Sequence, residues 1–143
     1  MNEWKFKYSS APGNVHKLFE VWSPAKGNDE NHYKKELYKY LRAKFRGSKV
    51  QKEYEQENVR ADFAIDNEIL VRVVYNLQKT SDYQKLIRQI LEYRTWMGKV
   101  LILLIGKTEP KMSKNIKVEI DGLNFKLFRG KTKGQFTVIE KAL

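Results

Sequence analysis

Hydrophobic positions along the chain recur with two different periods, and these periods predict alternating helices and strands. In residues 29–45 the apolar positions lie four residues apart, which is typical of a helix with one buried face. The positions are Tyr33, Leu37, Leu41 and Phe45. Asp29 stands just before this pattern, where its side chain can accept from the first free N–H groups. We therefore expect a helix capped by Asp29 that reaches Phe45.

Alternating and continuous apolar runs follow and predict strands. We expect strands over residues 49–56, 59–65 and 69–77, with the last two joined as a hairpin. A second helix is expected to start at Ser81, where apolar residues again recur at helical spacing. Residues 100–105 are apolar at every position, which is typical of a central strand covered on both faces.

Two further segments flank this core. The first is a short strand and a short helix, expected over residues 4–8 and 14–22. The second is a C-terminal β-meander over about residues 114–140, because apolar residues alternate with polar ones there. Asp121-Gly122 within it is a strong signal for a two-residue hairpin turn, and a last strand is expected over residues 136–139.

The order α-β-β-β-α-β predicts an α/β fold with a mixed sheet flanked by helices. A chain of 143 residues suits a single domain, here 1–143 with a core of about 29–106. The absence of cysteine excludes disulfides and thiolate metal sites. No apolar run approaches the roughly 20 residues needed to cross a bilayer, and the N-terminus has no apolar signal region. We therefore expect a cytoplasmic protein that does not bind a membrane.

The net charge of +11 is concentrated at the two ends of the sequence. Residues 1–46 carry 10 Lys and Arg against 5 Asp and Glu, and residues 107–143 carry 9 against 4. Residues 47–98 carry 8 of each sign. Such basic segments attract polyphosphate by releasing counterions, without reading a sequence. Charge therefore makes nucleic acid a candidate partner, and with the motifs described below we expect that nucleic acid to be DNA.

The middle of the chain contains a recognisable order of elements and polar residues. A strand carrying Asp62 turns into a second strand, a helix containing Gln89 and Tyr93 one turn apart follows, and then comes the apolar strand. Over roughly residues 30–106, this arrangement resembles the PD-(D/E)XK, or restriction-endonuclease-like, superfamily in its RecB-like branch. The resemblance implies a restriction-endonuclease-like core.

The resemblance also implies roles for individual residues. Glu36 matches the helix glutamate and Asp62 the strand aspartate of a Mg²⁺ site, and Gln89 and Tyr93 match the Gln-x-x-x-Tyr that contacts nucleic acid or the active-site carboxylates. Family members carry Glu/Asp-x-Lys on the second strand, whereas this chain reads Arg72-Val73-Val74. The second carboxylate and the lysine of the catalytic set are therefore replaced.

Strand geometry predicts what the replacement does. If Asp66-Asn67-Glu68 forms a three-residue turn, Asp62 and Arg72 lie opposite each other, with about 5 Å between their β-carbons. A guanidinium neutralises a facing carboxylate much as a metal ion would. We therefore expect no cofactor; Mg²⁺, with Asp62 as its ligand, is expected only if the site is active.

Together these patterns predict a nucleic-acid-binding protein that resembles a nuclease but has lost catalysis. The side chains expected to contact nucleic acid are those of Lys34, Lys35, Lys39, Arg42, Arg46, Arg72, Arg129, Lys131 and Lys133. No base-reading motif is present, so the binding should be nonspecific or directed by structure.

Two alternatives remain open. One is an active Mg²⁺-dependent endo- or exodeoxyribonuclease in which Asp66 or Glu68 supplies the second carboxylate and Lys79 the cation. The other is a protein-interaction module that presents exposed rings to a partner, with Trp4, Tyr8 and Trp96 as candidates. A homodimer through the tail strands is also possible, because an unpaired strand edge invites pairing.

Overall fold

The computed structural model describes residues 17–56, 59–130 and 136–142, with the backbone alone for residues 125–130. The strand predicted over residues 4–8 lies outside the described residues, as does the start of the helix predicted over residues 14–22. The described part of that helix is helical over residues 17–20.

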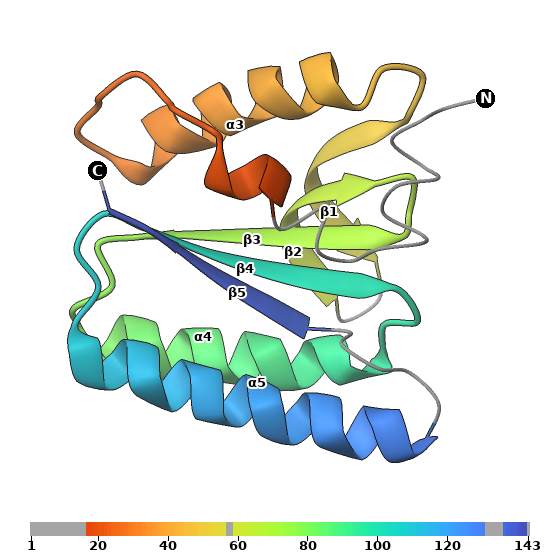
Figure 1. Ribbon diagram of the computed structural model, residues 1–143, viewed down its shortest axis with the longest axis vertical. Coiled ribbons are helices and arrows are strands. Elements are labelled where there is room, and N and C mark those ends of the chain that lie inside the picture. The colour runs from red at the N-terminus through yellow and green to blue at the C-terminus, as the bar shows by residue number, and fades with distance from the viewer. Residues whose placement is uncertain (1–16, 57–58, 131–135, 143) are drawn as a thin grey trace.

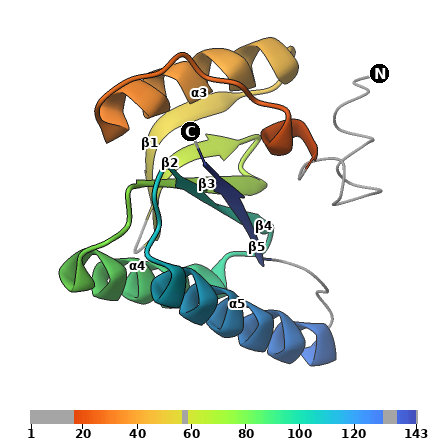
Figure 2. The ribbon, with the colours of Figure 1, turned by 60° about the vertical axis from the view of Figure 1, so that its left-hand side comes forward.

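The chain folds into three layers, with a mixed five-stranded sheet between helices (Figures 1 and 2). Helix α3 (Glu30–Lys44) covers one face of the sheet, and α4 (Thr80–Glu92) and α5 (Pro110–Gly130) cover the other. A short 3₁₀ turn, η1 (Tyr93–Thr95), follows α4. The strands, in their order across the sheet, are β1 (Val50–Gln56), β2 (Val59–Ile65), β3 (Ile69–Tyr75), β4 (Lys99–Ile105) and β5 (Phe136–Lys141). The expected α/β class with a mixed, helix-flanked sheet is confirmed.

The sheet is antiparallel on one side and parallel on the other. Strand β2 pairs antiparallel with β1 and β3, whereas β4 pairs parallel with β3 and β5. The pair Ile65↔Ile69 closes the hairpin between β2 and β3, so residues 66–68 form the predicted three-residue turn. Asp66 and Asn67 adopt φ values of 53° and 54° there, in the left-handed region.

Helix α3 forms as its sequence predicts. The Asp29 side chain caps it by accepting from the N–H of His32 at 2.8 Å. Its buried residues are Tyr33, Leu37 and Leu41, followed by Phe45 at the C-cap. Because these positions lie on one face, the helix packs against the sheet with Lys35, Lys39, Arg42 and Lys44 exposed, whereas Lys34 is half-buried.

Two hydrophobic cores hold the layers together. The core under α3 includes Phe19, Trp22 and alternate residues of β2 and β3. The core under α4 and α5 includes Leu86, Ile90 and the other residues of the same strands. Strand β4 contributes to both cores, which confirms the expectation of a central strand buried on both faces. No helix in the described part of the chain is long and apolar enough to span a membrane.

The predicted C-terminal β-meander is wrong. Residues 110–130 form helix α5, and the Asp121-Gly122 pair lies inside it rather than at a hairpin. Ile116 and Ile120 are four residues apart, so they fit a helix stripe as well as an alternating strand, and both are buried. Val118, which lies between them, is 62% exposed. Only the last predicted strand is confirmed, and β5 joins the central sheet beside β4.

Candidate functional site

Strands β2 and β3 separate part of the way along their length, and the candidate site lies in the gap. Their ladder runs from Ile65↔Ile69 only to Phe63↔Val71, whereas β3 stays paired with β4 as far as Tyr75↔Ile105. The separation frees backbone groups that must find other partners. Polar side chains from four elements supply these hydrogen-bond partners.

Asp62 occupies the point of separation. One of its carboxylate oxygens accepts from the N–H of Val73 at 2.6 Å and from Nη1 of Arg72 at 2.8 Å. Its other oxygen lies 2.9 Å from Nζ of Lys34, which reaches across from α3. The Asp62 side chain is only 14% exposed, so these three donors take the place of solvent.

Arg72 is fixed by three acceptors. Besides Asp62, its Nη1 donates to the carbonyl of Val73 at 2.6 Å, and its Nε donates to Oε1 of Gln89 at 2.8 Å. The predicted opposition of Asp62 and Arg72 is therefore confirmed, and Gln89 of α4 lies in the same network. The Arg72 side chain is 16% exposed.

Lys34 and Glu30 continue the network onto α3. Lys34 pairs with Oε2 of Glu30 at 3.0 Å as well as with Asp62. The other Glu30 oxygen accepts from the N–H of Tyr75 at 3.3 Å. Burial alone would lower the pKa of Lys34, but its hydrogen bonds and ion pairs with Asp62 and Glu30 outweigh burial and raise that pKa. Lys34 therefore stays charged and adds a second cation to Asp62.

Tyr93 lies beneath the gap, with its ring 1% exposed. Its hydroxyl donates to the carbonyl of Arg60, one of the backbone groups on the separated part of β2. Burial raises the pKa of Tyr93 well above the usual value, so the hydroxyl remains a donor. The position predicted to contact nucleic acid is thus occupied by an internal backbone contact.

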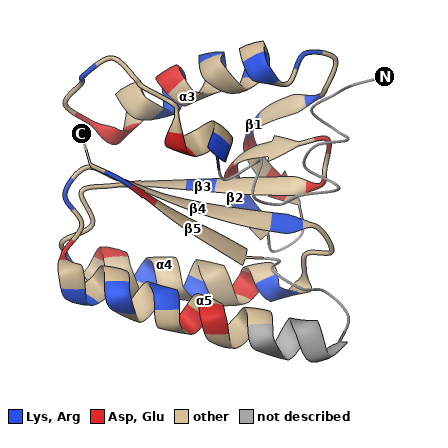
Figure 3. Cartoon of the chain, viewed as in Figure 1, with Lys and Arg blue, Asp and Glu red and all other residues tan. Residues whose placement is uncertain are grey.

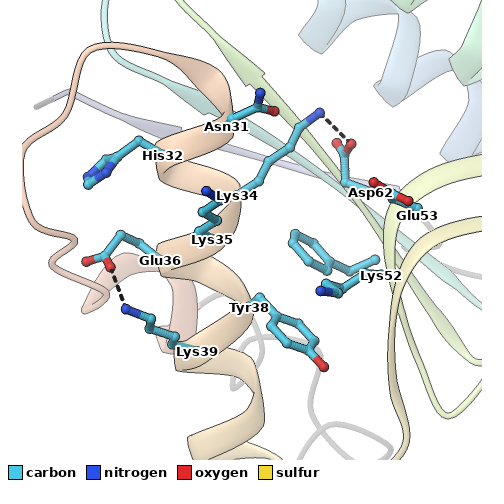
Figure 4. A pocket seen from close by; sticks show the side chains of 11 residues that line it. Asn31, His32, Lys34, Lys35, Glu36, Tyr38, Lys39, Lys52, Glu53 and Asp62 are labelled. Atoms are coloured by element: carbon cyan, nitrogen blue, oxygen red, sulfur yellow. Dashed lines mark ion pairs between the residues drawn. The ribbon is translucent and has the colours of Figure 1, made fainter.

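Glu36 is not brought to Asp62. Its Oε1 accepts from the N–H of Ala25 at 3.1 Å and its Oε2 lies 3.7 Å from Nζ of Lys39. Figure 4 shows both side chains on the side of α3 away from Asp62. The α3 glutamate that joins the network is Glu30, one residue after the cap, and no motif in the sequence singled it out.

Glu53 of β1 carries an unusual backbone conformation beside the site. Its φ is +50°, in the region that residues with a Cβ avoid, and it is the one position left out between the pairs Lys52↔Phe63 and Tyr54↔Ala61. The position opposite it on β2 is Asp62. Figure 4 places the Glu53 side chain next to Asp62, and no periodic pattern in the sequence indicated this strain.

Two hollows meet at Asp62. One, of about 330 Å³, is lined by the network and by Tyr54, Glu55, Arg60 and Lys85. The other, of about 580 Å³, lies between α3 and the β1–β2 hairpin (Figure 4). Lys34, Glu53 and Asp62 line both.

The predicted phosphate-binding side chains divide into several groups. Lys35, Lys39 and Arg42 are exposed on α3 and Arg46 is exposed in the turn after it, whereas Lys34 and Arg72 are engaged with Asp62. Arg129 lies at the end of α5, and Lys131 and Lys133 lie outside the described residues. Figure 3 shows basic positions on α3, α4 and α5, hence in both helical layers. The basic ends of the sequence therefore do not gather on a single face.

The residues named for the alternatives are placed elsewhere. Asp66 lies in the β2–β3 turn, where its carboxylate accepts from the N–H of Lys49 at 2.8 Å, and Lys79 is the N-cap of α4. Trp96 is half-buried and donates to the carbonyl of Glu68 at 3.1 Å, while Trp4 and Tyr8 lie outside the described residues. Among the described residues, no three His, Cys, Asp or Glu side chains form a group that could hold a metal ion.

Comparisons of the chain with models of protein families, with curated proteins and with solved structures yield no match.

Proposed function

We propose that this chain is a nucleic-acid-binding protein, with DNA as its partner, built on a restriction-endonuclease-like core of the RecB-like branch that has lost hydrolysis. The observation that carries the proposal is the guanidinium of Arg72 held 2.8 Å from Asp62. A Mg²⁺ ion bound by this carboxylate would have to displace a fixed cation and leave that cation unpaired.

The order of elements supports the same proposal. α3, β1, β2, β3, α4 and β4 follow one another as the resemblance implies, with Asp62 on β2, Arg72 on β3 and Gln89 on α4. Gln89 faces the cleft through its bond to Arg72. Lys34 supplies a second positive charge beside Asp62. The cleft therefore holds two ordered cations that an approaching phosphate can contact.

The exposed face of α3 supports binding without cleavage. Lys39 lies 3.7 Å from Glu36, and Lys35, Arg42 and Arg46 have no ion pair among the residues that the structure describes. Side chains of this kind attract phosphates through counterion release, which does not depend on base sequence.

A titration of fluorescently labelled DNA, followed by anisotropy at several salt concentrations, tests the proposal. Binding should weaken steeply with salt, and the triple variant Lys39→Ala/Arg42→Ala/Arg46→Ala should bind more weakly with a shallower slope, by roughly 0.9 per lost phosphate contact on duplex DNA. The matched control removes three exposed lysines from the other layer, Lys107, Lys111 and Lys114. Absence of any binding at low salt would rule the proposal out.

Loss of hydrolysis is tested separately. Plasmid and single-stranded DNA incubated with Mg²⁺ or Mn²⁺ should remain intact, with the Asp62→Ala variant as the control for contaminating nuclease. Cleavage by the parent chain that disappears in Asp62→Ala would show an active enzyme.

A further inference from the structure

The larger hollow, of about 580 Å³, combines an aromatic surface with basic side chains. Tyr38 and Phe63 both line it, and their rings are nearly parallel, at 10°, with centroids 6.1 Å apart. Nζ of Lys52 lies 4.8 Å from the centroid of the Tyr38 ring, and the guanidinium carbon of Arg42 lies 5.7 Å from it. Tyr38 is half-buried, so part of this side chain remains exposed at the hollow.

The hollow opens beside the stripe of cations on α3. Lys35, Lys39 and Arg42 follow one another at steps of four and three residues, which places them along one face of α3, and Arg46 follows in the turn after the helix. At the rise of an α-helix, Lys35 and Arg42 lie about 10 Å apart along the axis, which is the length of a few nucleotides. Lys35 and Lys39 belong to the stripe and also line the hollow, so the two features are continuous.

We infer that this hollow receives one unstacked base of a single-stranded nucleic acid whose phosphates follow the stripe on α3. Proteins that bind single strands combine aromatic rings for stacking with a basic track for the backbone. The volume is within the range of small-ligand sites and accommodates a nucleotide. A base held within a duplex cannot enter a hollow of this kind without being unpaired and turned out.

The inference rests on the proposed function and restricts the class of nucleic acid that the chain binds. Lys34, Glu53 and Asp62 line both hollows, so a strand with one base beside Tyr38 would place its neighbouring phosphate near Asp62 and Arg72. The ligand class is therefore a single strand, or the single-stranded end of a duplex, rather than a continuous duplex.

Anisotropy titrations with a labelled oligothymidine and a blunt hairpin duplex of similar length, at low salt, test this inference. The parent chain should bind the single strand more tightly. Tyr38→Ala should weaken single-strand binding about tenfold or more, from the loss of one stacking partner, and should change duplex binding less than about twofold. Tyr38→Phe should retain the affinity of the parent chain.

Tyr83→Ala is the matched control, because Tyr83 is also half-buried but belongs to α4 on the other face of the sheet. Its single-strand affinity should stay within about twofold of the parent value. Equal affinity of the parent chain for both ligands, or an equal loss for both in Tyr38→Ala, would overturn the inference and leave the proposed function standing. Failure to bind either ligand would reject both.

A second measurement uses the unmodified chain, so it does not depend on the folding of a variant. A 2-aminopurine base placed in turn at each position of a short single strand should lose fluorescence at one or two positions on binding, because stacking on Tyr38 quenches it. Unchanged or evenly changed fluorescence at every position would overturn the inference.

Discussion

The carboxylate of Asp62 and the guanidinium of Arg72 meet at 2.8 Å where β2 and β3 separate. This pair does two things at once. It supplies a backbone N–H and a backbone C=O of Val73 with partners that the interrupted ladder no longer provides. It also places a fixed cation on the carboxylate that a metal would need. The same contact therefore links the stability of the sheet to the proposed loss of catalysis.

Removing the carboxylate should destabilise the fold. Asp62→Ala leaves Arg72, Lys34 and the Val73 N–H without their shared acceptor in a mostly buried place. We expect the free energy of unfolding to fall by about 2–4 kcal/mol. Urea denaturation measures the change, and Asp121→Ala on the exposed side of α5 is a control expected within about 0.5 kcal/mol of the parent. A loss as small as that of the control would mean that the network contributes nothing to the free energy of unfolding.

Introducing the Glu-x-Lys pattern of the proposed superfamily should create a metal site. The parent chain should give no Mn²⁺ binding heat in calorimetry, because Arg72 already neutralises Asp62. Arg72→Glu combined with Val74→Lys supplies the missing ligand and cation, so Asp62-dependent Mn²⁺ binding is expected in the double variant.

Each single change should produce weaker Mn²⁺ binding than the double variant, and Val74→Lys should also lower stability. Arg72→Glu alone places a second carboxylate beside Asp62 but does not supply the lysine that Val74→Lys would add. Val74 is 7% exposed and packs in the core under α4 and α5, so Val74→Lys should lower the midpoint of thermal unfolding. Tight Mn²⁺ binding by the parent chain that is lost in Asp62→Ala would show that the role given to Arg72 is wrong.

Relieving the strain at Glu53 should stabilise the protein. Glycine adopts a φ of +50° without steric cost, so Glu53→Gly should raise the free energy of unfolding by about 0.5–1 kcal/mol. Glu55→Gly, two residues along the same strand, should lower it by about 0.5–1 kcal/mol. Thermal unfolding of the two variants should therefore move in opposite directions; a loss in both would mean that Glu53 makes a stabilising contact that offsets its strain.

We expect Tyr93 to stabilise the fold rather than to contact DNA. Tyr93→Phe removes the donor to the carbonyl of Arg60 and should cost about 1–3 kcal/mol of stability while leaving DNA affinity unchanged. Because burial raises the pKa of Tyr93, its ultraviolet titration should begin only when the protein unfolds in alkali. A fall in DNA affinity without a fall in stability would instead support a direct contact.

Glu140 should make stability depend on pH in acid. Its hydrogen bonds with Lys117 and Ser113 lower the pKa of this carboxyl from its usual 4.5. A lowered folded-state pKa contributes stability above pH 4.5 that is lost as pH falls through the folded-state value. Glu140→Gln should therefore be less stable than the parent at pH 7, and the difference should shrink below pH 4.5. Denaturation curves at several pH values measure it, and a constant difference would contradict the assignment.

The sequence alone determined the elements whose patterns have one interpretation. Asp29 followed by apolar residues at every fourth position allows only a capped helix, and six consecutive apolar residues before Gly106 suit only a strand buried on both faces. Hairpin geometry predicted that Asp62 and Arg72 face each other if residues 66–68 form a three-residue turn, and the pair Ile65↔Ile69 shows that turn.

The tertiary structure decided what local patterns leave ambiguous. Ile116 and Ile120 satisfy both periods, and they became helical because a continuous apolar stripe on α5 covers a sheet face that a meander would leave open. Pro110 after Glu109, whose carboxylate accepts from the N–H of Met112 at 3.0 Å, was the helix-start signal in the sequence.

The site was divided in the same way. The resemblance singled out Asp62 and Gln89, and strand register placed Arg72 opposite Asp62, which is a local rule. The rotation of α3 over the sheet decides which of its side chains join the network. It brings Lys34 and Glu30 to the network and leaves Glu36 outside it. Packing of the whole buried face sets that rotation, and no short-range pattern encodes it.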